Sequence, residues 1–350
     1  MFGLQFSLRK IFSALYGNFK EVRMSVKDSV LKALEAGKGG FISGEALSDS
    51  LGVSRTAVWK AIKLLREEGY PIESSTNRGY MLMQSSWLIT EESLRTYLPA
   101  PYKGNDIYIY DSLESTNLEA KQTALEGGAH GTVVMARRQT KGRGRLGRSF
   151  FSPDEGIYIS VILRPALDIS KSLPATLAAA VAVAESIEEV CGKEALIKWV
   201  NDIYVDGKKV CGILTEGITD FETGSVDSLI TGIGINTTVK DFPEELLDTV
   251  GAVTGSYSKS ALAASVISKL LDFTEDLDNR AFMKAYREKC LVLGKTVNVY
   301  RGAYKVDPQK ESKGVPARVL DITDDGGLVV LYSNGSQEVL TTGEISIRLK

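Results

Sequence analysis

The sequence predicts an α+β protein built from several domains, because its pattern changes twice along the chain. Near the N-terminus short helical patterns alternate with glycine turns, in the middle strand and helix patterns alternate, and from residue 294 only short β segments occur. These patterns favour a winged helix-turn-helix, a mixed-sheet α/β domain and a small β-barrel, in that order. A chain of 350 residues with 43% apolar content can fill the cores of two or three such domains.

Composition excludes several classes of function. The chain has 42 Lys and Arg against 44 Asp and Glu, a formal net charge of -2, so any DNA binding must be local. Cys191, Cys211 and Cys290 form no CxxC pair and His130 is the single histidine, which excludes a disulfide framework and a zinc site. A reducing cytoplasm fits this usage. The longest apolar run, residues 173–184, is too short to span a membrane.

The first residues differ from the rest of the chain. Residues 1–23 combine Phe and Leu with Lys and Arg, but they have neither a clean apolar segment nor a small-residue cleavage site. They are therefore not a signal peptide. Because Met24 leads directly into a helical pattern, we expect residues 1–23 to be a dispensable extension added by an upstream start codon.

Residues 24–84 are predicted to form the winged helix-turn-helix. Apolar residues at helical spacing predict a first helix over 26–36, and Ser43 and Ser54 can cap a second and a third helix on either side of a glycine turn. Residues 71–83 alternate around a Thr-Asn-Arg-Gly turn, which is typical of a β-hairpin wing.

The third helix carries the residues that we expect to contact DNA. Its N-terminal end lies where a recognition helix usually reads base edges. The candidates are Ser54, Arg55, Thr56, Trp59, Lys60 and Lys63. The alternative is an ordinary solvated helix face, with Trp59 packed against the core. Because acidic residues lie close by, the domain is weakly basic, and we expect two copies to bind a palindrome.

A polar linker at 84–86 leads to a central domain at 85–292 and a C-terminal domain at 293–350. In the central domain the sequence predicts strands at 107–111, 132–137, 156–163 and 228–235, helices at 117–126, 174–190, 260–271 and 280–289, and a hairpin at 197–214. In the C-terminal domain, glycine turns at 324–327 and 333–336 separate short strands, which is typical of hairpins in a small β-barrel.

The most informative stretch is residues 141–148, in which three glycines alternate with four cations. Glycine lets the backbone approach a ligand closely, and arginine offers a planar fork that matches carboxylate and phosphate oxygens. The run lacks the ending of a Walker A sequence and is too cationic for a Rossmann fingerprint. It predicts a loop that closes over an anion, and a solvated basic loop is the alternative.

Polar residues stand at two places before this loop. Ser115, Thr116 and Asn117 occur where a strand gives way to a helix, and they are either ligand contacts or a helix cap. Gln139 and Thr140 follow an apolar strand, as ligand contacts or as strand-edge residues.

The hairpin predicted at 197–214 carries a charged cluster. Its Asp-Gly turn places Asp202 opposite Cys211, and alternation puts Lys198, Asp202 and Lys209 on one face. Such charges are costly to bury unless they pair with each other or meet a ligand. The cluster is therefore a candidate site, with a salt bridge at the sheet edge as the alternative.

Residues 232–236 end a buried strand with two glycines and the amide of Asn236. Glycine inside a strand indicates that another group approaches the backbone closely.

Five motifs in this order resemble the bifunctional biotin protein ligase and biotin operon repressor family (BirA family). They are S-T-N at 115–117, Q-T-K-G-R-G-R-L-G-R at 139–148, K-W-V-N-D at 198–202, K-V-C-G-I-L at 209–214 and G-I-G-I-N at 232–236. The likeness runs from about residue 24 to the end of the chain, including G-E-I-S at 343–346. It implies a biotin ligase catalytic domain at 85–292 and an SH3-like β-barrel at 293–350.

The resemblance implies an ATP-dependent biotin protein ligase. Such an enzyme makes biotinyl-5'-AMP from biotin and ATP with Mg2+, and then transfers biotin to a lysine of the biotin carboxyl carrier protein. As a homodimer that holds the adenylate, it also represses biotin genes at operator DNA.

The resemblance also implies a role for each matching residue. Contacts with biotin or its adenylate would be made by Ser115, Thr116, Asn117, Gln139, Arg143, Gly144, Arg145 and Lys209. The nucleotide and Mg2+ would be surrounded by Lys198, Asn201, Asp202 and Asn236. The catalytic residues would be Arg145, Lys209, Lys198 and Asp202. No metal site made by the protein alone is expected, and Mg2+ would arrive with ATP near Asn236.

Two residues depart from the family pattern. Val200 stands where the family usually has proline, and Phe150 stands where a tryptophan is common. Both keep apolar bulk, so we expect altered packing rather than lost chemistry. Residues 1–23 have no counterpart in the family.

Three other functions fit part of the pattern. A regulator that senses a small anion without catalysis would release no pyrophosphate from biotin and ATP. A lipoate or octanoate transfer enzyme of related fold would need neither the cationic loop nor the winged domain. A ligase whose N-terminal domain no longer represses would not bind its own upstream DNA.

Overall fold

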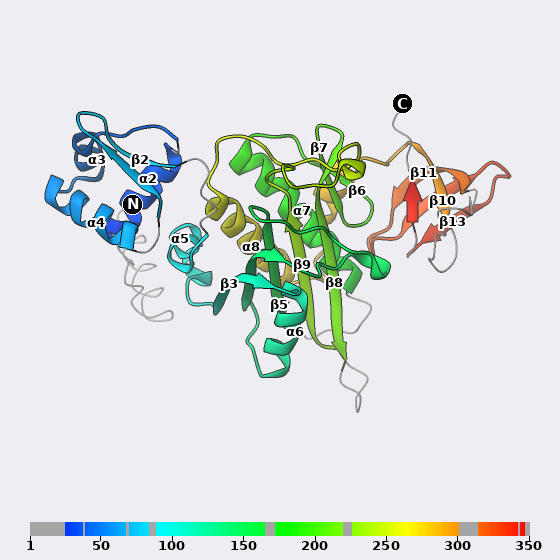
Figure 1. Cartoon of the computed structure of the whole chain (residues 1–350). Coiled ribbons are helices and arrows are strands. Elements are labelled where there is room, and N and C mark those ends of the chain that lie inside the picture. Colours follow the sequence, from blue (N-terminus) through cyan, green and yellow to red (C-terminus); the bar gives the residue numbers. More distant parts are fainter. Residues whose placement is uncertain are drawn as a thin grey trace, which may run out of the picture.

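The structure is a computed structural model that describes residues 25–37, 39–67, 70–83, 89–164, 172–219, 226–300, 314–341 and 344–346. Figure 1 shows three parts in a row: the N-terminal helices, a large sheet with its helices, and the C-terminal strands. The predicted extension at 1–23 and the predicted linker at 84–86 lie outside the described residues. Within the described part of the chain, no helix is long and apolar enough to cross a membrane.

The N-terminal part contains three helices and a two-stranded wing, as the sequence predicts. The elements are α2 (Val26–Ala36), α3 (Gly44–Leu51), α4 (Arg55–Glu67), β1 (Ile72–Ser75) and β2 (Gly79–Leu82). The side chains of Ser25 and Ser43 accept hydrogen bonds from backbone N–H groups three residues further on, which caps α2 and α3. Gly52, at φ 63°, ends α3 in the left-handed conformation that glycine tolerates best. The inner faces of α2 and α4 form a separate small core.

Hydrogen bonds and close backbone packing hold the wing against the helices. The guanidinium of Arg66 on α4 donates hydrogen bonds to the Ile72 carbonyl oxygen (2.8 Å) and to Ser74 Oγ (2.5 Å), both on β1. Gly79 lies against the backbone of Ile42 so closely that a Cβ atom would collide with it. Arg66 therefore positions the wing relative to the helix that precedes it.

A seven-stranded mixed sheet forms the middle of the molecule. Its strands lie in the order β3 (Ile107–Leu113), β4 (Val133–Gln139), β5 (Ile157–Leu163), β9 (Val226–Ile235), β8 (Lys208–Thr219), β7 (Asp202–Val205) and β6 (Leu196–Lys198). Among the strands that the structure describes, β3 and β4 are parallel, and the other neighbours are antiparallel. The strands predicted in apolar runs are present, each displaced by two residues at most.

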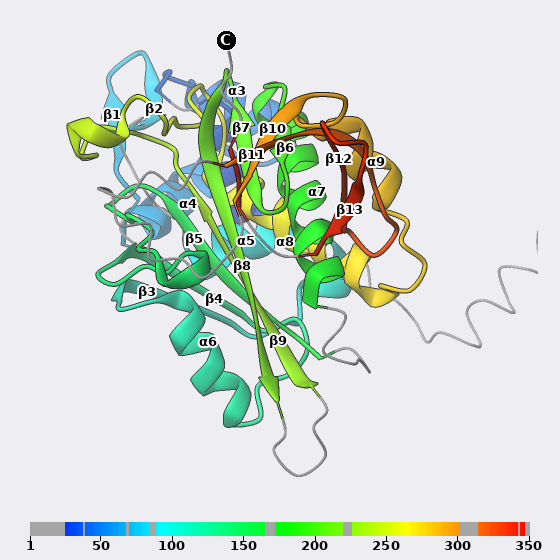
Figure 2. The ribbon, with the colours of Figure 1, turned by 90° about the vertical axis from the view of Figure 1, so that its right-hand side faces the viewer.

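Helices cover both faces of this sheet (Figure 2). α6 (Thr116–Leu125) packs on one face through Ala120 and Ala124. On the other face α7 (Ser172–Cys191) and α8 (Lys259–Glu275) pack against the strands, and α9 (Met283–Lys289) packs on α7. Residues 175–184 of α7 are mostly small and fully buried, which allows close packing. The remaining short helices are α5 (Glu91–Tyr97), η1 (Ala100–Tyr102), η2 (Arg145–Gly147) and η4 (Glu244–Leu246).

The hairpin predicted at 197–214 has a break in its first arm. That arm forms two short strands, β6 and β7, which fold back on each other and pair Lys198 with Asp202. Asn201 stabilises the turn between them, because its side chain donates to the Ile213 carbonyl oxygen (2.8 Å) and its own carbonyl accepts from the Ile213 N–H (3.0 Å). The predicted hairpin had no break between residue 197 and its Asp-Gly turn. This part of the prediction was wrong, because the alternation of apolar and polar residues did not reveal the turn between β6 and β7.

The pairing of β7 with β8 contains a β-bulge. Tyr204 pairs with Lys209 of β8, but the register shifts between Ile203 and Tyr204. Asp202 consequently lies opposite Gly212, and the prediction that it would lie opposite Cys211 was wrong. A bulge adds one residue to one strand of a pair, and no residue type in the sequence marked its position.

The C-terminal part is a five-stranded antiparallel sheet in the order β13-β12-β11-β10-β14. Its strands are β10 (Thr296–Tyr300), β11 (Val315–Ile322), β12 (Leu328–Tyr332), β13 (Gln337–Leu340) and β14 (Glu344–Ser346). The glycine turns predicted at 324–327 and 333–336 join β11 to β12 and β12 to β13. Buried valines of β10, β11 and β12 belong to the same core as the central sheet.

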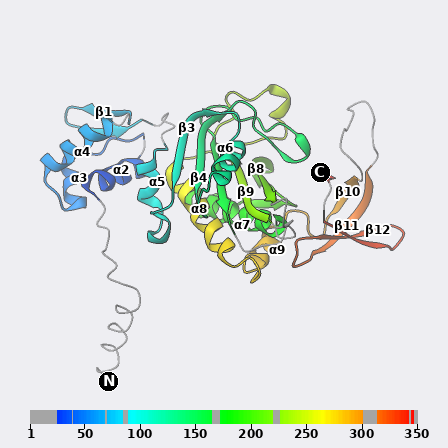
Figure 3. The same cartoon turned by 90° about the horizontal axis from the view of Figure 1, so that it is seen from below.

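Side-chain hydrogen bonds join the N-terminal part to the central part. Figure 3 shows α5 between the N-terminal helices and the large sheet. Glu35, near the end of α2 and 6% exposed, accepts hydrogen bonds from Tyr97 OH of α5 (2.7 Å) and from Ser258 Oγ (2.7 Å). Ser258 also caps α8. One carboxylate of the N-terminal part therefore contacts two elements of the central part.

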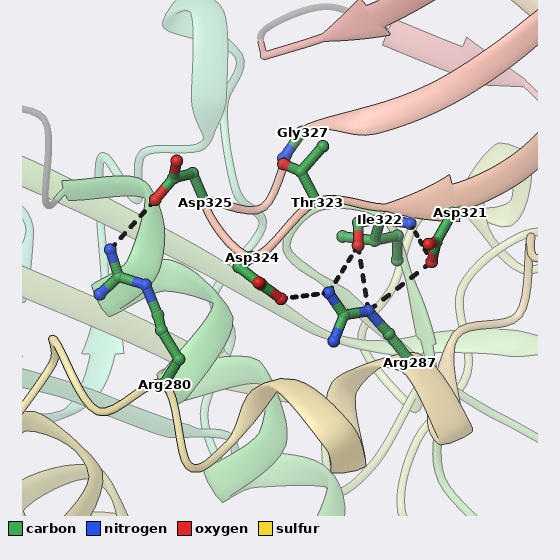
Figure 4. A network of polar contacts seen from close by, with 8 residues as sticks. All are labelled: Arg280, Arg287, Asp321, Ile322, Thr323, Asp324, Asp325 and Gly327. Atoms are coloured by element: carbon green, nitrogen blue, oxygen red, sulfur yellow. Dashed lines mark hydrogen bonds and ion pairs between the residues drawn. The ribbon is translucent and has the colours of Figure 1, made fainter.

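Two arginines join the C-terminal sheet to the central part (Figure 4). Arg287 of α9 donates to the Ile322 carbonyl oxygen (2.8 Å) and pairs with Asp324 (2.6 Å). Arg280 pairs with Asp325 (3.3 Å). Both acidic partners lie in the turn between β11 and β12, so this turn is the docking point.

Candidate functional site

A pocket of about 220 Å³ opens where strands β6 to β9 meet the start of α6 and the cationic loop. Among the residues predicted to bind substrate or nucleotide, those that line it are Ser115, Thr116, Asn117, Gln139, Arg143, Gly144, Arg145, Lys198, Asn201, Asp202 and Lys209. Folding therefore brings the loop, the polar residues and the charged hairpin to one place.

The cationic loop returns on itself beside the pocket. The Gly144 N–H donates to the Arg148 carbonyl oxygen (2.7 Å), and the Phe150 N–H donates to the Gly142 carbonyl oxygen (2.8 Å). A Cβ atom on Gly142 would collide with the Phe150 carbonyl oxygen, so this return requires glycine. The loop is thus a folded turn that presents its arginines to the pocket.

The glycines of the sheet make room for two pocket side chains. Cβ atoms on Gly212 and Gly234 would contact the ring of Phe150, which lines the pocket. A Cβ atom on Gly232 would collide with the side-chain amide of Asn117. The close approach predicted for the glycines of β9 is therefore made by side chains of the protein itself.

One wall of the pocket is a network of neutral polar groups. Gln139 Oε1 accepts a hydrogen bond from the Thr116 N–H (2.8 Å) and lies 3.1 Å from Thr116 Oγ1. Ser160 Oγ lies 2.8 Å from Thr116 Oγ1 and 2.7 Å from Asn117 Oδ1. Ser115 is buried and makes no capping hydrogen bond through its side chain, which argues against a helix cap as the role of this segment.

Sequence reasoning missed two members of this network, Ser160 on β5 and Glu216 on β8. Glu216 accepts hydrogen bonds from Asn117 Nδ2 (2.8 Å) and Lys121 Nζ (2.7 Å). Burial acts to raise the pKa of Glu216, but the hydrogen bonds from Lys121 and Asn117 and the charge of Lys121 outweigh it and lower this pKa. The sequence signal that could have identified Ser160 and Glu216 was a polar residue within an apolar strand.

A second wall carries charge. Lys209 Nζ lies 2.6 Å from Asp202 Oδ1, and the backbone of Lys209 is held by residues 249–251. Arg145 donates to Asn201 Oδ1 (3.3 Å), which links the loop to the turn between β6 and β7. The salt bridge considered as an alternative is present, and both of its residues also line the pocket.

The pocket has a strong excess of positive charge. Its cations are Arg143, Arg145, Arg148, Lys198 and Lys209, and its single carboxylate within the described lining is Asp202. Such a site attracts anions and stabilises negative charge that develops during a reaction. Cys211 of β8 is fully buried, which raises the pKa of its thiol, so it is not a reactive thiolate. The arrangement favours anion binding and charge stabilisation over covalent catalysis.

The predicted nucleotide residue Asn236 is not part of the described pocket lining. It is 4% exposed, its Nδ2 donates to the Gly251 carbonyl oxygen (3.2 Å), and its Oδ1 has no hydrogen-bond partner among the described atoms. An amide oxygen is a suitable ligand for Mg2+. In the described part of the chain, however, no cluster of three or more His, Cys, Asp or Glu could hold a metal. Asn236 Oδ1 therefore fits Mg2+ as an ion that a phosphate ligand brings.

The residues predicted to contact DNA lie on α4 and in the turn before it. All six are exposed: Ser54, Arg55, Thr56, Trp59, Lys60 and Lys63. Ser54 Oγ accepts from the Ala57 N–H (3.2 Å) and caps α4, as predicted. The side chain of Trp59 is 54% exposed, so the alternative of core packing was wrong. Arg55 and Lys63 each form an exposed ion pair with a nearby glutamate.

Comparison with families of known proteins gives matches in all three parts. Residues 27–81 match an HTH domain family, residues 110–236 match the Biotin/lipoate A/B protein ligase family, and residues 311–348 match the Biotin protein ligase C terminal domain family.

Two similar proteins carry the same name, Bifunctional ligase/repressor BirA. The one from Bacillus subtilis (strain 168) is 38% identical over 270 residues, which cover 76% of this chain and 80% of that one. The one from Escherichia coli (strain K12) is 27% identical over 315 residues, which cover 89% of this chain and 94% of that one.

Similar solved structures include the biotin protein ligase from Aquifex aeolicus in complex with biotin and ATP. Its TM-score is 0.56 and its identity 27%, over 70% of this chain and 99% of that one. The apo structure of that protein gives a TM-score of 0.53 at 25% identity, over 70% of this chain and 100% of that one.

Proposed function

Because this chain belongs to the biotin protein ligase family, we propose that its pocket joins biotin to ATP and passes the biotinyl group to a carrier protein. The observation that carries this proposal is that the cationic loop, the polar wall and the Lys209–Asp202 pair line one pocket. Biotinyl-5'-AMP contains a phosphate, an acyl group joined to that phosphate and the cyclic urea of biotin. The pocket offers cations for the first two and neutral hydrogen-bonding groups for the third.

In the first half of the reaction, a carboxylate oxygen of biotin attacks the α-phosphorus of ATP. A new P–O bond forms, the bond to pyrophosphate breaks, and biotinyl-5'-AMP remains bound. Arg143 and Arg145 would hold the phosphate, and Lys209 would orient the carboxylate. Each charge-assisted hydrogen bond contributes about 1.5–3 kcal/mol. Positioning and charge stabilisation therefore suffice, without a covalent enzyme nucleophile.

The remaining pocket residues would place the two substrates. Ser115, Thr116, Asn117, Gln139 and Gly144 would contact biotin or the adenylate, and Lys198, Asn201 and Asp202 would lie at the nucleotide. Mg2+ bound to the phosphates would neutralise their charge. Asn236, whose Oδ1 lacks a partner among the described atoms, would lie near that ion.

In the second half, the amine of an acceptor lysine attacks the acyl carbon of the adenylate. The amide bond forms, the bond to the phosphate oxygen breaks, AMP leaves and the amine loses a proton. We propose the biotin carboxyl carrier protein as the acceptor, and a reducing cytoplasm as the compartment.

The six exposed residues on α4 and in the turn before it would bind operator DNA, and the adenylate would act as corepressor. Two copies that bind a palindrome double the number of phosphate contacts, which compensates for a weakly basic domain. We therefore propose that the adenylate-bound protein is a homodimer that represses biotin genes.

The test is incubation with radiolabelled biotin, ATP and Mg2+, followed by gel filtration. Pyrophosphate release and a labelled adenylate that elutes with the protein are expected. Binding of biotin without pyrophosphate release would instead identify a sensor. A gel shift with the protein's own upstream DNA, with and without biotin plus ATP, tests repression. Equal operator affinity in both conditions would eliminate the corepressor role.

A further inference from the structure

We infer that Glu216 is a positioning residue that sets the direction of the hydrogen bonds along the polar wall. This inference rests on the proposed function, because it concerns how the same pocket recognises the cyclic urea of biotin. Glu216 contacts the pocket residue Asn117 but is not itself in the described lining.

The environment of Asn117 fixes which end of its amide faces the wall. Asn117 Nδ2 lies 2.8 Å from Glu216 Oε2 and 3.2 Å from the Leu214 carbonyl oxygen, and both of these groups accept hydrogen bonds. The other carboxylate oxygen of Glu216 is held by Lys121 Nζ at 2.7 Å. Asn117 must therefore turn its oxygen toward Ser160 Oγ, 2.7 Å away.

The far end of the network is fixed in the same way. Gln139 Oε1 accepts from the Thr116 N–H (2.8 Å), and Gln139 Nε2 donates to Ser152 Oγ (2.9 Å). The network therefore begins and ends with an amide oxygen, and neither of these oxygens carries a proton.

Counting protons along the network leaves one of its three contacts without a proton, and that contact holds an open acceptor. Its three contacts join Asn117 Oδ1 to Ser160 Oγ, Ser160 Oγ to Thr116 Oγ1, and Thr116 Oγ1 to Gln139 Oε1. Only the two hydroxyl groups have protons to give to these contacts. In one of the three contacts of the described network, two oxygens therefore face each other without a proton between them, and an outside donor can reach one of these oxygens.

The open acceptor lies where a ligand can reach it. Thr116, Asn117 and Gln139 all line the pocket. The matching ligand chemistry is an N–H donor, and the cyclic urea of biotin has two. A ligand that lacks the donor would leave a buried oxygen unpaired, which costs binding free energy.

Replacement of the carboxylate by an amide should reverse this preference. In Glu216→Gln, Lys121 still needs an acceptor and holds the new amide oxygen, so the new NH2 group faces Asn117. The Asn117 amide then turns over and gives up its longer contact with Leu214. Its nitrogen supplies a third proton to the network, so each of the three contacts then holds a proton of its own and none needs a donor from a ligand.

The experiment compares ligands across variants of the full chain by titration calorimetry. The ligands are biotin and the two lactam analogues in which one or the other urea N–H is replaced by CH2. Wild type should bind one lactam about ten-fold more weakly than biotin. Glu216→Gln should bind biotin about ten-fold more weakly than wild type does and should no longer discriminate against that lactam.

Three further variants separate hydrogen-bond direction from structural damage. Lys121→Met keeps the carboxylate as an acceptor, so its ratio of biotin to lactam affinity should equal that of wild type. In Lys121→Met combined with Glu216→Gln, the amide oxygen is released to face Asn117, and the ratio should be restored. Glu188→Gln is the matched control, because Glu188 pairs with Lys289 (2.5 Å) outside the pocket lining.

The outcomes are distinct. A wild-type ratio in Glu216→Gln overturns the inference, and so does an equal loss of biotin affinity in Glu216→Gln, Lys121→Met and Glu188→Gln. If wild type binds no biotin at all, the proposed function itself fails. If wild type binds biotin and Glu216→Gln leaves the ratio unchanged, the inference alone fails.

Discussion

Trp199 donates a hydrogen bond from its indole nitrogen to the carbonyl oxygen of Gly326, 2.9 Å away. Trp199 lines the pocket, and Gly326 lies in the β11–β12 turn that Arg280 and Arg287 hold on the central part. Gly326 has φ 87° and lies against Leu177 of α7. The C-terminal sheet therefore docks on a wall of the pocket, and a displacement of its turn should alter ligand binding.

Gly326→Ala is expected to weaken both stability and binding of biotin and ATP. A Cβ atom would collide with Leu177, and a left-handed residue other than glycine costs about 1–2 kcal/mol in any case. Gly335→Ala is the matched control, because Gly335 has φ 84° and a Cβ atom there has no neighbour within 4 Å among the described atoms. Both variants should lower Tm, but only Gly326→Ala should raise the Kd values measured by calorimetry. Equal Kd values would show that the docking contact does not shape the pocket.

Lys209→Met is expected to weaken biotin binding strongly. The change removes the cation that would orient the carboxylate, and it leaves Asp202 without the ion pair at 2.6 Å. A loss of about 1.5–3 kcal/mol corresponds to roughly 10- to 150-fold in Kd. Lys193→Met removes a lysine that pairs with the exposed Asp206 away from the pocket, and it should change nothing. An unaltered biotin Kd would remove Lys209 from the site.

Arg145→Gly is expected to retain part of the adenylation activity but to release the intermediate. Arg145 links the cationic loop to Asn201, so its loss removes this link together with the proposed contact to the phosphate. Released biotinyl-5'-AMP should label lysines of unrelated proteins, which a blot for biotin detects. Arg137→Gly, which removes a cation outside the pocket lining, should keep labelling selective. Unchanged selectivity in Arg145→Gly would refute the role of this residue.

Glu35→Met is expected to reduce the response of DNA binding to biotin and ATP. One oxygen of Glu35, Oε2, accepts from both Tyr97 and Ser258, and a methionine side chain of similar length cannot replace either hydrogen bond. An unpaired buried donor costs about 1–3 kcal/mol. Gel shifts should show a ratio of operator affinities, with and without biotin plus ATP, closer to one than in wild type, while pyrophosphate release persists. An unchanged ratio would place the coupling elsewhere.

The contribution of Glu216 to stability should depend on pH. Its pKa is lowered on folding, because the bonds from Lys121 and Asn117 outweigh the opposing effect of burial. The ionised carboxylate therefore stabilises the fold at neutral pH, and this stabilisation is lost as the pH falls below the ordinary glutamate pKa of about 4.3 and through the lowered pKa of the folded state. The difference in Tm between wild type and Glu216→Gln should be constant near neutral pH and shrink in acid. A difference that stays constant down to pH 3 would contradict the lowered pKa.

Much of the architecture could be predicted from local signals. Strand β5 follows from its apolar run, and the turns at 324–327 and 333–336 follow from glycine placement. The charged cluster could also be foreseen, because Lys198, Asp202 and Lys209 stand in a predicted hairpin. The bulge beside Tyr204 could not, since an extra residue in a ladder changes the pairing without changing the residue types.

The missed residues depend on contacts between distant segments. Ser160 lies in a buried apolar strand. Its role depends on hydrogen bonds with Thr116 and Asn117, which lie more than forty positions away in the sequence. Glu216 would be an ordinary strand residue without Lys121 on a different element. Sequence patterns predicted which segments form the pocket, but the partners of these two side chains became visible only with the tertiary structure.

The absence of side chains at Gly212, Gly232 and Gly234 determines how the shape of this pocket can be changed. The space that side chains at these three positions would fill is taken by Phe150 and Asn117, which belong to other segments. Substitution of either side chain would therefore alter the outline of the cavity while the strand ladder beneath stays intact. Selectivity for a new cofactor analogue could be engineered at these two positions without rebuilding the scaffold.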